Sequence, residues 1–109
     1  MNRIYIKPLS VNEVWAGRRF KTPAYKSYEQ ELSYLLPKKL EIPNGKLELK
    51  ITFGFSNKAS DIDNPVKPLL DILQKTYGFN DKKIYKLEVE KVDVKKGEEY
   101  IEFKIDQLI

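Results

Sequence analysis

The sequence predicts a small α+β domain in which two helices pack on a mixed or antiparallel sheet. Four segments have the alternating or apolar character of strands, and two have the three-to-four-residue apolar spacing of helices. They follow in the order β-α-β-α-β-β, which is typical of this class. With 109 residues and no long linker, repeat or low-complexity run, residues 1–109 are expected to form a single domain.

The first three elements are a strand, a loop and a helix. Residues 3–7 alternate as a short strand, and residues 8–22 lack a period and should form a loop. A helix should begin at Pro23 with Thr22 as N-cap, because a proline at the first helical position leaves no N–H unpaired. Its apolar positions are Tyr25, Tyr28, Leu32 and Leu35, and Pro37 should end it.

The second strand and second helix have clear apolar faces. Residues 47–55 place Leu47, Leu49, Ile51, Phe53 and Phe55 on one side of a strand. The second helix should begin near Pro65 with Asn64 as its cap, and Gly78 should end it. Its apolar stripe consists of Val66, Leu69, Leu70, Leu73 and Tyr77.

The last two strands are expected to form a hairpin. Residues 84–95 and 99–105 flank the pair 96–97, which contains a glycine suited to a turn. Lys91 interrupts the apolar pattern of the first of these strands. A β-bulge that resets the register is the expected explanation, and a lysine that points inward to an acidic site is the alternative.

The composition excludes several kinds of chemistry. The chain has no Cys and no His, so disulfides, thiolate zinc sites, cysteine nucleophiles and imidazole bases are impossible. Residues 1–60 carry eleven basic and five acidic side chains, whereas residues 61–109 carry nine and eleven, which gives the net charge of +4. The basic half suggests a polyanionic partner, although a lysine-rich solubilising surface would produce the same charge.

Acidic side chains and one lysine gather around the start of the second predicted helix. Asp61 and Asp63 lie two residues apart in an extended segment, and Asp71 lies one turn after Lys67. Two carboxylates held close together are stabilised by a cation, and Mg²⁺ prefers such oxygen ligands. Capping and a surface ion pair are the alternative roles for these residues. Asp81, in a turn after the helix, joins them only if that turn folds back toward Asp61 and Asp63.

The loop before the first helix mixes cations with aromatic residues. Cationic side chains can neutralise phosphates, and aromatic rings can stack on exposed bases. We expect Phe20 to pack on the core instead. The candidate DNA-binding residues are Asn12, Trp15, Arg18, Arg19, Lys21 and Lys26.

Together, these motifs resemble the RusA family of Holliday-junction resolvases, which are small crossover-junction endodeoxyribonucleases. The resemblance runs from about residue 5 to residue 105. The matching residues are Asp61-x-Asp63-Asn64-x-x-Lys67-x-x-x-Asp71, then Gly78-Phe79-Asn80-Asp81-x-x-Ile84, then Lys91, with a looser echo at Pro8-Leu9-Ser10-Val11-Asn12. A lysine follows Asp81 where many relatives have a further acid.

The resemblance implies a homodimer that nicks two strands of a four-way DNA junction symmetrically, in recombination and repair, with Mg²⁺ or Mn²⁺. By position, Asp61, Asp63 and Asp81 would bind the metal and Lys67 would be the essential lysine, so these four would be catalytic. Asn64, Asp71 and Lys91 would have supporting roles. The alternatives are a nuclease for other branched or single-stranded DNA and a non-catalytic DNA-binding module.

No membrane or targeting segment is evident in the sequence, so a cytoplasmic location is expected. The resemblance implies a bacterial source, or a gene carried by a phage or prophage.

Overall fold

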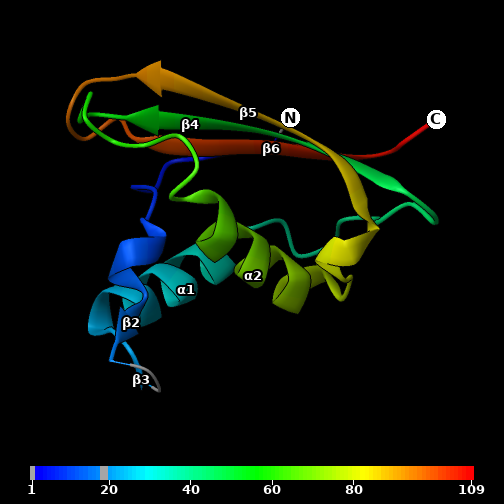
Figure 1. The fold of residues 1–109 in the computed structure, drawn as a ribbon, viewed down its shortest axis with the longest axis horizontal. Coiled ribbons are helices and arrows are strands. Elements are labelled where there is room, and N and C mark those ends of the chain that lie inside the picture. The colour runs from blue at the N-terminus through cyan, green and yellow to red at the C-terminus, as the bar shows by residue number, and fades with distance from the viewer. Residues whose placement is uncertain (1, 18–19) are drawn as a thin grey trace.

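The computed structural model describes residues 2–17 and 20–109, and it confirms the α+β class (Figure 1). Within these described residues, six strands, two helices and two 3-10 helices follow one another along the chain. Their bounds are β1 Asn2–Ile4, η1 Val11–Glu13, β2 Trp15–Ala16, β3 Phe20–Lys21, α1 Pro23–Leu35, β4 Leu47–Phe55, α2 Val66–Tyr77, η2 Asp81–Lys83, β5 Ile84–Asp93 and β6 Tyr100–Gln107. Within the described part of the chain, no helix is long and apolar enough to cross a membrane.

The main sheet is mixed and has the strand order β1-β6-β4-β5. Its central strand, β4, pairs antiparallel with β6 and parallel with β5. The predicted hairpin is therefore wrong, because β5 and β6 lie on opposite sides of β4. Residues 94–99 can cross one intervening strand, since two strand spacings amount to only about 10 Å. The arrangement gives the apolar strand β4 a partner on each side.

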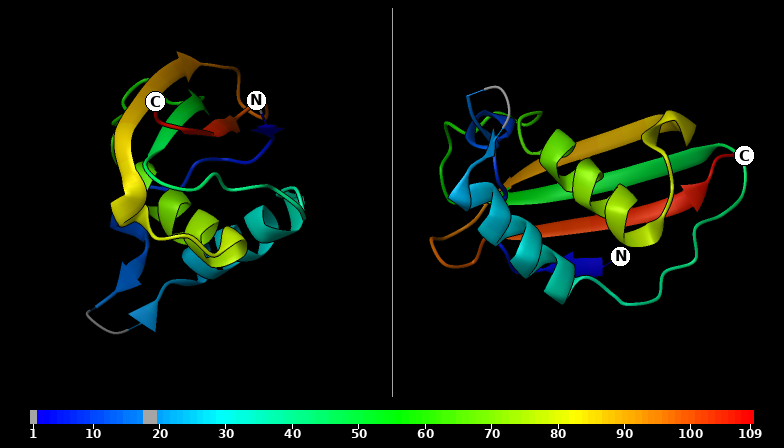
Figure 2. Two further views of the ribbon diagram at one scale, coloured as in Figure 1. Left: turned by 90° about the vertical axis from the view of Figure 1, so that its right-hand side faces the viewer. Right: turned by 90° about the horizontal axis from the view of Figure 1, so that it is seen from below.

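Both helices lie on the same face of the sheet and form the core with it (Figures 1 and 2). The face of β4 predicted to be apolar is buried along its whole length. α2 contributes Leu69, Leu70, Ile72 and Leu73, and α1 contributes Tyr25, Tyr28 and Leu32. The apolar stripe predicted for α2 is therefore largely confirmed, with Val66 and Tyr77 packed at its margin.

The start of α1 follows the prediction, and its end differs in one residue. The Thr22 hydroxyl accepts a hydrogen bond from the backbone N–H of Tyr25 at 3.1 Å, and Pro23 is the first helical residue. Leu36 leaves the helical conformation just before Pro37, as a residue that precedes proline is expected to do. Leu36 therefore turns into the core at 3% exposure, whereas Leu35 is 41% exposed and does not belong to the apolar face.

The start of α2 corrects a second prediction. The helix begins at Val66, and Pro65 is its N-cap without a side-chain hydrogen bond. The Asn64 side chain is not the cap, because its amide donates instead to Oδ2 of Asp61 at 3.3 Å. The helix ends as predicted at Gly78, which adopts a left-handed conformation with φ of 71°.

Candidate active site

The loop of residues 56–65 joins the end of β4 to the start of α2 and carries the first two acids. Asp61 and Asp63 are both exposed, and the backbone carbonyl of Asp63 accepts from the Val66 N–H at 3.1 Å. The carbonyl of Asn64 accepts from the Val11 N–H at 2.8 Å. This hydrogen bond attaches η1, and the basic segment that follows it, to the loop that carries the acids.

Lys67, the second residue of α2, contacts two carboxylates. Its Nζ lies 3.1 Å from Oδ1 of Asp71 and 3.3 Å from Oδ2 of Asp81. These contacts, above all the hydrogen bond to Asp71, raise the pKa of Lys67. The ammonium is therefore charged at neutral pH and holds two acids from different elements on one side of α2. The predicted pair between Lys67 and Asp71 is confirmed.

Three local features return Asp81 to the side of α2. The left-handed Gly78 reverses the chain at the end of the helix. Asn80 then caps η2 by accepting from the Lys82 N–H at 3.0 Å. The side-chain oxygen of Gln74 accepts from the Asp81 N–H at 2.8 Å, which fixes η2 against the helix. The turn therefore folds back onto α2, and the Asp81 carboxylate reaches Lys67. Among the described residues it does not form a close group with Asp61 and Asp63, so the predicted condition for Asp81 to join those two acids is not met.

The donor set fits a hard divalent cation in its chemistry. The four aspartates around α2 offer oxygen atoms, and the chain has no softer Cys or His ligand. The acids are not drawn together into a ready metal site, since no three acidic side chains cluster closely within residues 2–17 and 20–109. The Lys67 ammonium already forms ion pairs with the Asp71 and Asp81 carboxylates. A cation that bound these two carboxylates would have to compete with that ammonium.

Lys91 points inward, and the predicted bulge at this position is wrong. The register between β4 and β5 is regular through Phe53 and Lys91, and its one irregularity lies near the start of β4. Lys91 therefore shares the helix-covered face with Phe53. Its Nζ donates to the carbonyls of Lys58 at 3.1 Å and Ser60 at 2.6 Å. It is in no ion pair with an acid of the described residues, but it holds the backbone immediately before Asp61.

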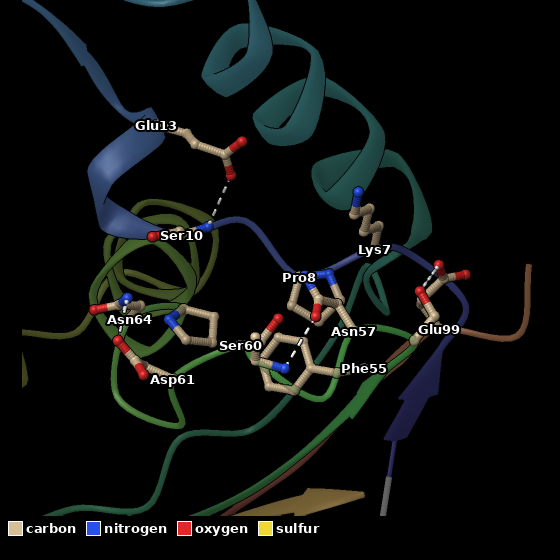
Figure 3. A pocket seen from close by; sticks show the side chains of 13 residues that line it. Lys7, Pro8, Ser10, Glu13, Phe55, Asn57, Ser60, Asp61, Asn64 and Glu99 are labelled. Carbon is tan, nitrogen blue, oxygen red and sulfur yellow. Dashed lines mark hydrogen bonds between the residues drawn. The ribbon is translucent and has the colours of Figure 1, made fainter. Parts of the chain in front are cut away.

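A cavity of about 310 Å³ opens beside Asp61 (Figure 3). Phe55 and Pro8 provide its apolar surface, and Asp61 and Asn64 lie together at one margin. Glu99 lies at the other side and accepts a hydrogen bond from the Ser56 hydroxyl at 2.7 Å. The cavity therefore adjoins the loop that Lys91 holds.

The segment predicted as a loop contains η1 and the two-stranded sheet of β2 and β3. Trp15 pairs with Lys21 across this sheet, and the Lys21 ammonium lies 4.8 Å from the Trp15 ring centre. Phe20 is 72% exposed, so the expectation that it packs on the core is wrong. Asn12 and Lys26 are exposed, whereas Arg18 and Arg19 lie outside the described residues.

Two contributions to the site were missed at the sequence level. Gln74 fixes η2 by accepting the hydrogen bond from the Asp81 N–H. The signal for this role was a polar side chain at position 74 of the predicted helix, one turn after Leu70. The backbone carbonyls of Lys58 and Ser60 accept hydrogen bonds from Lys91. Every residue has such a carbonyl, so the residue types at these positions could not have predicted the contacts.

Comparison with known proteins gives one family match. The family model described as Endodeoxyribonuclease RusA matches residues 10–105. This range includes η1, the acids around α2, Lys67 and Lys91. No curated protein matches the chain.

Proposed function

The chain belongs to the RusA family of endodeoxyribonucleases, and from this we propose that it resolves four-way DNA junctions by paired symmetric nicks, in recombination and repair. The family itself implies a nuclease that acts on Holliday junctions. Dependence on Mg²⁺, symmetric nicking and a homodimeric state are parts of the proposal.

One observation supports the proposal most strongly: Lys67 joins Asp71 and Asp81 on the side of α2, close in sequence to the exposed Asp61 and Asp63. In a chain without His or Cys, phosphodiester hydrolysis must rely on carboxylates, lysine, tyrosine or a cation bound by oxygen ligands. We propose that Asp61, Asp63 and Asp81 hold Mg²⁺, for which Mn²⁺ would substitute. When bound, such a cation lowers the pKa of a water molecule and polarises the phosphate.

The chain's own residues have separate proposed roles. The carboxylate neighbours of Lys67 raise its pKa, so its side chain is a charged ammonium. This ammonium stabilises the negative charge that develops on the phosphoryl oxygens. Asp71 holds that ammonium from the next turn of α2. Residues 15–21, which contain β2 and β3, are called the β2–β3 segment. Trp15, Lys21 and the other candidate DNA-binding residues, which lie in or beside this segment in the sequence, bind DNA beside the acids.

The test is a nicking assay on a labelled mobile four-way junction with Mg²⁺. Asp63→Asn should bind the junction as tightly as the wild type or more tightly, because it removes charge repulsion. Its nicking rate should fall by about 100-fold or more, as for loss of a group that stabilises the transition state. Asp106→Asn is the matched control, because Asp106 pairs with Lys104 at the end of β6. Undiminished nicking by Asp63→Asn would contradict the site.

Substrate comparison separates the remaining alternatives. The same proteins are assayed on a junction, a flap, a single strand and a plain duplex. Paired nicks confined to the junction support resolution, whereas faster cutting of flaps or single strands supports a different branched-DNA nuclease. Binding without any cutting, in Mg²⁺ and in Mn²⁺, supports a non-catalytic DNA-binding module.

A further inference from the structure

A second basic surface lies at the opposite end of α2 from the β2–β3 segment. There, Gly45, Lys46, Lys82, Lys83 and Tyr85 line a hollow of about 410 Å³. We call Lys46, Lys82, Lys83 and Tyr85 the distal patch. It brings the residue before β4 together with η2 and the start of β5, and these segments lie at the same end of the molecule (Figures 1 and 2).

The distal patch carries positive charge that its surroundings do not neutralise. No acid lines the hollow. Across residues 2–17 and 20–109, none of its three lysines is in an ion pair, whereas Lys50, Lys86 and Lys104 on the main sheet all are. The distal patch therefore presents three uncompensated ammonium groups at one surface.

Tyr85 adds an amphipathic surface to these charges. Its side chain is 64% exposed, and the Lys46 ammonium lies 4.7 Å from its ring centre. This contact is within the range of a cation–π interaction, which orders a lysine that would otherwise be free. A phenol hydroxyl can also donate to a phosphate oxygen. The combination fits a phosphate backbone better than it fits a small apolar ligand.

The position of the distal patch relates it to the candidate active site. Lys82 and Lys83 directly follow Asp81, whose carboxylate contacts Lys67. η1, which directly precedes the β2–β3 segment, adjoins the other end of α2 through the hydrogen bond from the Val11 N–H to the Asn64 carbonyl. α2 has 12 residues, so it spans about 18 Å, or about five steps of a DNA strand.

We propose that the distal patch binds the phosphate backbone of a duplex DNA arm, about five base pairs along that arm from the phosphates that the β2–β3 segment contacts. The inference rests on the proposed function and adds to it a second anchor. DNA would then lie along α2 between two basic surfaces, with the carboxylates and Lys67 between them. The distal anchor would set the direction in which the arm leaves the active site.

The first test measures how DNA affinity depends on salt, without divalent metal so that no strand is cut. One variant combines Lys46→Ala, Lys82→Ala and Lys83→Ala. The control combines Lys50→Ala, Lys86→Ala and Lys104→Ala, which removes the same net charge from lysines that are already paired. Each phosphate contact contributes about 0.9 to the slope of log affinity against log salt. The distal variant should therefore lose about two to three units of slope and the control less than about one.

The second test locates the contact on the DNA. Single phosphates of one junction arm are replaced by uncharged methylphosphonates, at increasing distance from the nick. The wild type should lose affinity at two groups of phosphates about five base pairs apart, one group for each basic surface, as the length of α2 requires. The distal variant should be insensitive to replacements in one of these two groups and keep its sensitivity to the other. Thermal melting establishes that all the variants are folded.

The outcomes distinguish this inference from the proposed function. Wild-type nicking of junctions, together with equal salt slopes in the distal variant and the control, would overturn the distal anchor and leave the proposed function standing. A methylphosphonate effect that persists in the distal variant would do the same. If the wild type binds no DNA at any salt concentration, both proposals fail.

Discussion

Lys67 shows what a single residue contributes to this site. Its pairing with Asp71 follows from their spacing on a helix, and the sequence predicted it. Its contact with Asp81, at 3.3 Å, joins residues fourteen positions apart. That contact depends on the left-handed Gly78 and on the hydrogen bond from the Asp81 N–H to Gln74, which together reverse the chain.

Gly54 is a second residue whose identity the structure explains. It lies on the face of β4 away from the helices, opposite Tyr100. A methyl group on Gly54 would come within 2.5 Å of the Tyr100 ring. The ring is also covered by the Arg3 guanidinium, which lies 4.1 Å from its centre, so it cannot move freely.

Gly54→Ala should therefore destabilise the protein by about 1–3 kcal/mol, as overpacking of a filled site usually does. Chemical denaturation with a linear extrapolation measures this difference. Thr52→Ala, on the same face of the same strand, is the control and should cost less. Because the clash is with one ring, Tyr100→Leu should relieve part of the cost in the double variant. A stability of Gly54→Ala equal to that of the wild type would refute the packing argument.

At the scale of elements, Lys91 connects β5 to the loop that carries Asp61. The ammonium is half-buried, and its two hydrogen bonds are to backbone carbonyls of that loop. Lys91→Met keeps the unbranched side chain up to the position of Cε and leaves both carbonyls without this donor. Lys91 is a positioning residue, because it acts on the candidate site through the loop that carries Asp61.

We expect Lys91→Met to lower the junction nicking rate about tenfold, as misplacement of catalytic groups does, while junction affinity changes by less than about twofold. Lys91→Arg, which can still donate to the carbonyls, should recover part of the rate. Lys95→Met is the control on an exposed lysine just beyond β5. If Lys91→Met lowered the junction affinity and the nicking rate by the same factor, Lys91 would have a general structural role instead.

The two helices are linked by one ion pair whose strength depends on pH. Nζ of Lys75 on α2 lies 2.9 Å from Oε2 of Glu29 on α1, and this hydrogen bond lowers the pKa of Glu29 below its ordinary value of 4.5. A carboxyl group whose pKa is lower in the folded protein than in the unfolded protein stabilises the fold at pH values above its pKa in the unfolded protein. That contribution disappears as the pH falls through the folded pKa.

The wild type should therefore lose more stability than Glu29→Gln as the pH falls from about 6 to about 3. The difference should be less than about 1 kcal/mol, because the pair is partly exposed. Urea denaturation at several pH values measures it. Glu31→Gln, on the exposed side of α1, is the control, because Glu31 is not in an ion pair with any described residue. Parallel pH profiles for wild type and Glu29→Gln would show that the pair contributes nothing.

At the scale of the whole molecule, the proposed paired nicking requires two active sites. One chain carries one set of the candidate residues, and a four-way junction has approximate two-fold symmetry. A dimer with two-fold symmetry would place one site at each of two equivalent strands. The homodimer is therefore a requirement of the proposed paired nicking.

Mixed dimers of wild-type and Asp63→Asn chains should make single nicks in place of paired ones. Two different affinity tags on the co-expressed chains allow the mixed species to be purified. Nicks are scored on a junction with each strand labelled separately, beside both homodimers. Sedimentation at working concentration checks the oligomeric state. A monomer that still makes paired nicks would contradict the symmetric arrangement.

The sequence by itself determined the elements, because their signals are local. The caps of α1, the alternation in β4 and the glycine at the end of α2 act over a few residues, and each appears in the structure as expected. The candidate acids were chosen from their residue types and spacing together with the family resemblance, and their role as metal ligands is a proposal.

Only the tertiary structure decided which elements meet. The pairing of β5 and β6 on opposite sides of β4 maximises the burial of a central strand, and no local signal encodes that choice. The same pairing turns Lys91 inward, where it holds the loop before Asp61. Strand partners and long side-chain contacts are set by the free energy of the whole packed core, so residues far apart in sequence determine them together.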